Sequence, residues 1–119
     1  MAAPWGHAAG VECVPEVKYE CSSPRCTRVA EGFAHAEAYR YDTRSGVLTA
    51  CLWSGCFQGK VRRTESGSAY LLSGLLADHR GDRRLVSLHI DDGGRFSAQW
   101  HDAAAPVLEL GRCQSGARP

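Results

Sequence analysis

Apolar and polar residues alternate with a period of two along most of this chain from residue 34 onward. No long segment carries the i, i+3, i+4, i+7 apolar stripe of an amphipathic helix. Clusters of turn-forming residues separate the alternating runs, at 42–46, 64–68, 78–82 and 91–94. The pattern predicts strands at about 16–21, 26–30, 34–41, 46–52, 56–63, 69–77, 83–90, 95–101 and 107–113.

The short connections imply that consecutive strands are antiparallel neighbours. Eight or nine strands in such a meander form most economically a small barrel or a sandwich, because either arrangement removes or shortens exposed sheet edges. We therefore expect a single all-β domain over residues 13–113. A flexible segment at 1–12 and a flexible tail at 114–119 would flank it.

Two hairpins can be registered from their own residues. If Cys51 faces Cys56, that pair lies on the wetter face and Leu48 and Phe57 lie on the other. In the last hairpin, a three-residue loop at 92–94 with a glycine for positive φ aligns the apolar positions, whereas a two-residue turn would mix the faces. Together these registers predict a core of Leu48, Phe57, Val61, Val86, Leu88, Ile90, Phe96 and Trp100.

Six cysteines add covalent constraints to this pattern. Four of them repeat one spacing around a turn, and two lie near the ends of the chain. We predict two disulfides that each close a short turn, Cys21–Cys26 and Cys51–Cys56, and one that joins the two ends of the domain, Cys13–Cys113. The alternative is a zinc site, since two C-x4-C pairs separated by 24 residues fall within the range of structural zinc spacings. The spacing argues against a C-x-x-C redox enzyme.

The composition limits the cellular compartment and the classes of partner that we expect for this chain. Cysteine usage of this kind is typical of an oxidising compartment. The segment 1–10 lacks the basic start and apolar stretch of a secretion signal, so we expect a removed leader and a periplasmic or extracellular protein. Arginine far outnumbers lysine, which favours a bacterial source with a GC-rich genome. A net charge of +1 argues against bulk nucleic acid as a partner, and no apolar run approaches a membrane span.

Candidate catalytic chemistry is sparse. The chain has no phosphate-binding glycine loop, no nucleophile elbow and no H-E-x-x-H motif. His89, Asp91 and His101 would support a hydrolase if they lined one concave pocket. Histidines on an outward strand face are the ordinary alternative, and we expect no catalytic residue, metal or cofactor.

Two surface features suggest binding instead. Trp53 lies at the tip of a clipped turn, where an exposed tryptophan on a rigid loop is a plausible contact residue. Basic residues gather around the turns and predict a rim that could attract an anionic partner, or simply a solvated strand face; they are Lys60, Arg62, Arg63, Arg80, Arg83 and Arg84.

Two resemblances are carried by short motifs. The first is carried by Tyr19-Glu20-Cys21 with Cys26, by Cys51 and Cys56, by Asp92-Gly93-Gly94-Arg95-Phe96 and by Gly111-Arg112-Cys113. This arrangement resembles small secreted proteins of proteobacteria that have disulfides and no established activity.

The second resemblance is carried by Ser66-Gly67-Ser68-Ala69-Tyr70, which is similar to the S-G-x-x-Y motif of periplasmic inhibitors of c-type lysozyme. That resemblance implies a small disulfide-linked β-barrel with a cysteine near each end. It also implies that Ser66 helps to plug the lysozyme cleft and that Tyr70 supports the loop. This chain differs in its two extra cysteine pairs and in a longer segment after the motif.

The sequence thus favours a secreted binding domain without enzymatic activity, whose target is a protein or an envelope polymer. Ser66, Tyr70, Arg62, Arg63 and Trp53 are the candidate contact residues. An inhibitor of c-type lysozyme is the most concrete form of this interpretation. A hydrolase and a small-ligand barrel of lipocalin type are the alternatives; the small residues Ala50, Gly59, Gly74 and Ala98 permit such a barrel, while Phe57, Leu72 and Trp100 could equally fill it.

Overall fold

The computed structural model describes residues 10–22, 24–29, 36–52, 54–101 and 106–115. These residues form strands connected by turns and contain no helix. The strands are β1 (Gly10–Ser22), β2 (Arg25–Arg28), β3 (Ala38–Asp42), β4 (Val47–Leu52), β5 (Gly55–Lys60), β6 (Arg62–Ser66), β7 (Ala69–Ala77), β8 (Arg83–Ile90), β9 (Arg95–Trp100) and β10 (Val107–Ser115).

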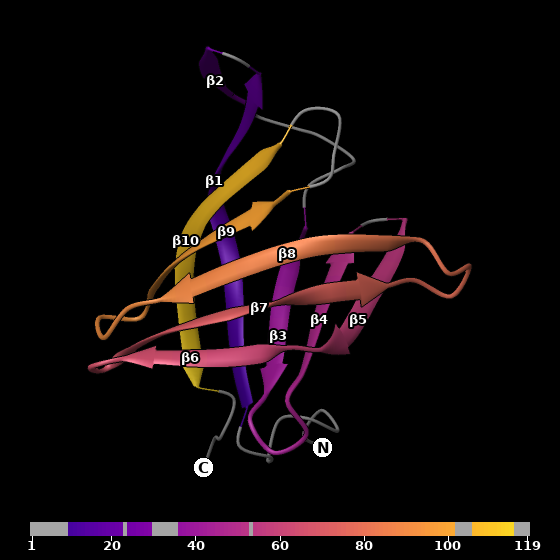
Figure 1. Ribbon diagram of the computed structural model, residues 1–119. Coiled ribbons are helices and arrows are strands. Elements are labelled where there is room, and N and C mark those ends of the chain that lie inside the picture. Colours follow the sequence, from indigo (N-terminus) through magenta and orange to yellow (C-terminus); the bar gives the residue numbers. More distant parts are fainter. Residues whose placement is uncertain (1–9, 23, 30–35, 53, 102–105, 116–119) are drawn as a thin grey trace, which may run out of the picture.

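Eight of these strands form a closed antiparallel barrel, in the order β1-β3-β4-β5-β7-β8-β9-β10, and the pairing of β10 with β1 closes it. The two extra strands extend the barrel wall. β2 pairs with the C-terminal part of β1 and projects beyond the barrel at the top of Figure 1. β6 pairs with the N-terminal part of β7. The predicted all-β class is confirmed, and of the two predicted arrangements the chain adopts the barrel.

Both predicted hairpin registers are confirmed. Cys51 pairs with Cys56 and Ala50 with Phe57 in the β4–β5 hairpin. In the β8–β9 hairpin Ile90 pairs with Phe96, and Gly94 has a φ of 81°, as the three-residue loop requires. Of the eight predicted core residues, seven are buried, and Val61 is half-buried against the same core.

The domain is longer at both ends than the predicted 13–113. β1 begins at Gly10, where Val11 and Glu12 pair with Ser115 and Gln114 of β10 and also with Tyr41 and Arg40 of β3. The segments predicted to be flexible therefore contribute to the barrel wall at residues 10–12 and 114–115. The pairing partners lie far away in sequence, so no local pattern marks these ends.

A bulge in β1 bends the wall where the barrel closes. The register between β1 and β10 shifts between Pro15 and Val17, and Gly111 lies opposite Pro15. A Cβ atom at Gly111 would lie 2.1 Å from the Val14 carbonyl oxygen and 2.8 Å from the Phe96 ring. Only glycine lets the two backbones approach this closely, and the Phe96 ring covers the gap.

A second corner divides the strand predicted at 56–63. Val61 separates β5 from β6, so that β5 closes the barrel against β7 while β6 follows β7 outward. Two glycines permit this crossing. A Cβ atom at Gly59 would lie 2.4 Å from the Leu75 carbonyl oxygen, and one at Gly74 would lie 3.3 Å from the Lys60 carbonyl oxygen.

The described barrel interior is filled by side chains. The largest fully buried ones include Tyr39, Leu48, Leu72, Leu76 and Leu88. Phe57 and Trp100 meet edge to face, with 5.9 Å between ring centroids. Of the small residues of the lipocalin-type alternative, Ala50 and Ala98 are buried among these large ones, whereas Gly59 and Gly74 lie at the corner between β5 and β6. The middle of the barrel is a packed core.

Candidate binding surface

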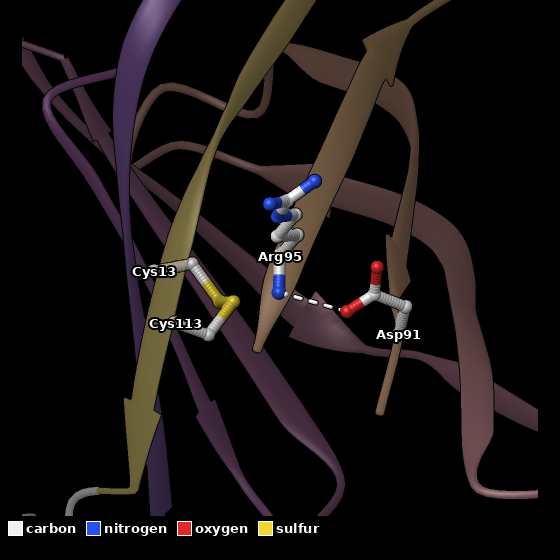
Figure 2. Close-up of a disulfide and its surroundings, with 4 residues drawn as sticks. All are labelled: Cys13, Asp91, Arg95 and Cys113. Carbon is white, nitrogen blue, oxygen red and sulfur yellow. Dashed lines mark hydrogen bonds between the residues drawn. A yellow bond between two sulfur atoms is a disulfide. The ribbon is translucent and has the colours of Figure 1, made fainter. Parts of the chain in front are cut away.

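The six cysteines form the three predicted disulfides, Cys13–Cys113, Cys21–Cys26 and Cys51–Cys56. No cysteine is free, so the thiolates that the alternative zinc site would need are consumed. Figure 2 shows the Cys13–Cys113 bond between β1 and β10, beside the turn from Asp91 to Arg95. The three bonds are consistent with an oxidising compartment.

The β8–β9 turn is organised by one carboxylate. Asp91 accepts hydrogen bonds from the backbone N–H groups of Gly93 and Arg95, each at 2.9 Å. The Arg95 bond in particular lowers the pKa of the Asp91 carboxyl below its ordinary value. Asp42 and Asp78 bind backbone N–H groups of their own turns in the same way. Their pKa values are also lowered; at Asp78 this occurs against a desolvation that acts to raise it.

The S-G-x-x-Y segment forms the tip of the β6–β7 hairpin, on the left in Figure 1. Ser66 pairs with Ala69, which leaves Gly67 and Ser68 as a two-residue turn. Gly67 has a φ of 65° and Ser68 does not have a positive φ. This is the pattern of a type II′ turn, in which glycine takes the first central position and the backbone twist matches that of the strands. Residues 66–68 are all exposed.

Side chains on one face of the hairpin hold the tip in place. The Arg63 guanidinium lies over the Tyr70 ring, 3.9 Å from its centroid, and the Arg63 Nε–H donates to a Glu65 carboxylate oxygen at 2.9 Å. Tyr70 is half-buried and its ring packs near that of the buried Tyr41, with centroids 6.4 Å apart. Burial raises the pKa of the Tyr70 phenol, and Arg63 offsets part of that rise. The tip is therefore anchored to the barrel through Tyr70.

The remaining predicted contact residues are distributed differently. Arg62 is exposed and pairs with Ser73, on the face of β6 opposite to Arg63. Trp53 lies outside the described residues. The structure thus brings Arg63 and Tyr70 together on one face of the hairpin, whereas strand alternation places Ser66 on the other face, which it shares with Arg62.

The predicted basic rim has members that pair with both halves of β7. Arg62 and Arg63 pair with Ser73 and Leu72. Other members lie at the far end of the same strand, where Arg83 and Arg84 pair with Ala77 and Leu76 and Arg80 lies in the adjoining turn. Lys60, the remaining member, ends β5 opposite Val47 of β4, and one continuous rim stays a prediction.

None of the cavities found in the described part of the chain is lined by His89, Asp91 and His101 together. His89 is exposed on β8 opposite Ser97. The Asp91 carboxylate is engaged by its own turn, as described above. His101 follows β9, and its Nε2 atom is hydrogen bonded to the Ser87 hydroxyl on the outer face of the barrel. This Ser87–His101 contact is a pairing that sequence reasoning missed, because its members lie on neighbouring strands.

A buried polar network is the other feature that sequence reasoning missed. Glu109 is fully buried and accepts hydrogen bonds from the Ala36 backbone N–H, at 2.9 Å, and from the Tyr39 hydroxyl. The Tyr39 hydroxyl in turn accepts the Trp100 indole N–H at 2.6 Å. Burial, reinforced by the Glu109 charge, raises the pKa of Tyr39 well above its ordinary value, so the phenol keeps the proton that it donates. Glu109 lies two residues after Val107, so strand alternation places both side chains toward the barrel interior. This alternation is the sequence signal for the buried carboxyl.

No protein family, no curated protein and no solved structure matches this chain. Among the described residues there is no helix that is long and apolar enough to cross a membrane.

Proposed function

We propose that this protein is a secreted or periplasmic binding domain, without catalytic activity of its own, that contacts a protein partner through the tip of its β6–β7 hairpin. The observation that carries this proposal is that residues 66–68 are exposed and that their conformation is fixed from both sides. The Gly67 turn fixes the backbone, and the Arg63–Tyr70 stack fixes the base of the tip. A tip held in one conformation loses little entropy when it enters a cleft.

A c-type lysozyme is the first partner to test. The S-G-x-x-Y motif resembles that of periplasmic lysozyme inhibitors, and the closed barrel with a disulfide between its terminal strands agrees with what that resemblance implies. In this proposal the Ser66 hydroxyl enters the cleft, and Tyr70 supports the tip from below. The three disulfides are compatible with the compartment in which such an enzyme acts.

Electrostatics sets a further expectation for this partner. Lysozymes of c type are basic, and the hairpin carries the exposed Arg62 at the start of β6, on the same face as Ser66. Charge repulsion slows association, and salt screens that repulsion. We therefore expect the association rate constant to rise between low and physiological ionic strength. The affinity would come from short-range contacts at the tip.

The test is inhibition of a c-type lysozyme on bacterial cell walls by the unmodified protein, by Ser66→Ala and by Ser68→Ala. Both serines are exposed in the same turn, so Ser68→Ala is a matched control. We expect inhibition by the parent, inhibition weakened about tenfold or more by Ser66→Ala, and little change from Ser68→Ala, since a buried hydrogen bond at an interface is lost only in the first variant. Absence of inhibition at a large molar excess of the parent removes lysozyme as the partner.

A second pair of variants tests the role of the anchored tip. Arg63→Gln removes the guanidinium from the Tyr70 ring, while Arg62→Gln removes the same charge from the other face of β6. Loss of inhibition in Arg63→Gln alone supports an anchored tip. Equal loss in both variants would assign the effect to net charge instead.

A further inference from the structure

A cavity opens at the end of the barrel opposite to the hairpin tip. It lies between the β4–β5 turn, the β7–β8 turn and the strand ends of β9 and β10, and its volume is about 300 Å³. This volume lies at the lower end of the range typical of small-molecule sites. The described residues that line it include Leu52, Phe57, Arg84, Trp100 and Val107, with the turn from Asp78 to Asp82 at its edge.

The floor of the cavity is apolar. The Phe57 and Trp100 rings meet there edge to face, and Val107 is buried beside them. The single polar atom of the indole does not face the cavity, because the Trp100 N–H donates to the buried Tyr39 hydroxyl, which is held in turn by Glu109. Trp100 therefore presents carbon to the cavity, and the buried network fixes the plane of its ring.

Arg84 supplies a cation at the edge of this apolar floor. The Arg84 guanidinium lies 5.9 Å from the centroid of the Phe57 ring, and within the described parts of the chain no carboxylate is in ion-pair contact with it. The neighbouring Asp78 accepts two backbone N–H groups of its own turn and pairs with Arg80 at 3.5 Å. Asp82 is exposed in that turn. The cavity thus combines an aromatic floor with a guanidinium that has hydrogen-bond donors to offer.

We propose that this cavity binds a small organic anion in which a flat aromatic ring carries one carboxylate. The ring packs against Phe57 and Trp100, and the carboxylate accepts hydrogen bonds from Arg84, whose planar donor set matches carboxylate geometry. The site is separate from the hairpin tip, because Arg84 and Ser66 lie toward opposite ends of β7.

The test uses 2-naphthoate and its uncharged counterpart 2-naphthalenemethanol as probes in isothermal titration calorimetry. We expect 2-naphthoate to bind with a sub-millimolar dissociation constant, at least about tenfold more tightly than the alcohol, because only the carboxylate can form charge-assisted hydrogen bonds with Arg84. Absence of naphthoate binding, or equal binding of both probes, overturns the proposal.

Two variants separate Arg84 from general charge. Arg84→Met should remove the preference for the anion, and Arg83→Met should keep it, since Arg83 is exposed, adjacent and not part of the cavity lining. Equal loss in both variants contradicts the assignment to Arg84. Should Arg84→Met fail to fold, the Trp100 indole N–H signal of the unmodified protein decides: naphthoate must shift it, and an unmoved signal at saturation overturns the site.

Discussion

At the scale of single residues, the most consequential group is a carboxyl that the alternation pattern places inside the barrel. Glu109 joins β10 to Tyr39 of β3 and to the backbone at Ala36, across separations of 70 and 73 residues. A buried polar network of this kind stabilises a fold only when its members are satisfied. The bonds from Ala36 and Tyr39 to Glu109 and the indole N–H bond to Tyr39 contribute to this here.

We predict that Glu109→Gln lowers the free energy of unfolding by about 1.5–3 kcal/mol, because the amide nitrogen of the glutamine must then face a hydrogen-bond donor. Glu37→Gln is the control, since Glu37 is exposed and its substitution should change stability by less than about 0.5 kcal/mol. Urea denaturation of both variants provides the measurement. An unchanged midpoint for Glu109→Gln would show that the network does not contribute as described.

The turn aspartates predict an acid-sensitive component of stability. The pKa values of Asp42, Asp78 and Asp91 are lowered in the folded protein, so the stability that they contribute is fully present above the ordinary value of 3.8. It is lost as the pH falls below 3.8 and passes through the lower folded pKa values. Replacing all three by asparagine should flatten this decline in urea midpoints below about pH 4. An equally steep decline in the variant would assign it to other groups.

At the scale of elements, the corners of the barrel depend on close backbone approach. We predict that Gly111→Ala lowers the free energy of unfolding by at least about 2 kcal/mol, because the new Cβ atom would lie 2.1 Å from a backbone oxygen that cannot move freely. Gly93→Ala serves as the control, since a Cβ atom there meets only an Asp91 carboxylate oxygen at 3.5 Å. Similar midpoints for the two variants in chemical denaturation would contradict this view of the β1 bulge.

The strands and turns also show how much of the fold could be predicted from the sequence. The two registered hairpins were predictable, because a short loop with glycine and an alternating pattern leave one alignment that puts Ile90 opposite Phe96. The start of β1 at Gly10 and the corner at Val61 were not, since both depend on strands far away in sequence. At the surface, the tip of the β6–β7 hairpin could be predicted from the S-G-x-x-Y motif. The barrel-end cavity required knowledge of which turns meet there.

At the scale of the whole molecule, closure of the barrel joins the two ends of the domain. β10 pairs with β1 along most of its length, and Cys13–Cys113 bonds the same two strands across 100 residues of sequence. The other two disulfides each span only 5 residues within one hairpin. The entropy that a disulfide removes from the unfolded chain grows with the length of the closed loop.

We therefore predict an order of stabilities among paired cysteine substitutions. Loss of Cys13–Cys113 should cost up to about 5 kcal/mol, and loss of Cys21–Cys26 about 2 kcal/mol, from loop-closure entropy alone. Thermal denaturation of the two double alanine variants measures the order. A lower melting temperature for the variant without Cys21–Cys26 would contradict the dominance of the terminal closure.

The most direct test of the proposed binding surface is an NMR titration of the 15N-labelled protein with an unlabelled c-type lysozyme. We predict that backbone amide signals of residues 63–70 shift or broaden on complex formation. Signals of residues 78–82, at the other end of β7, should stay in place. Shifts that centre on another surface, or a spectrum unchanged at saturating lysozyme, would contradict the hairpin tip as the contact element for this partner.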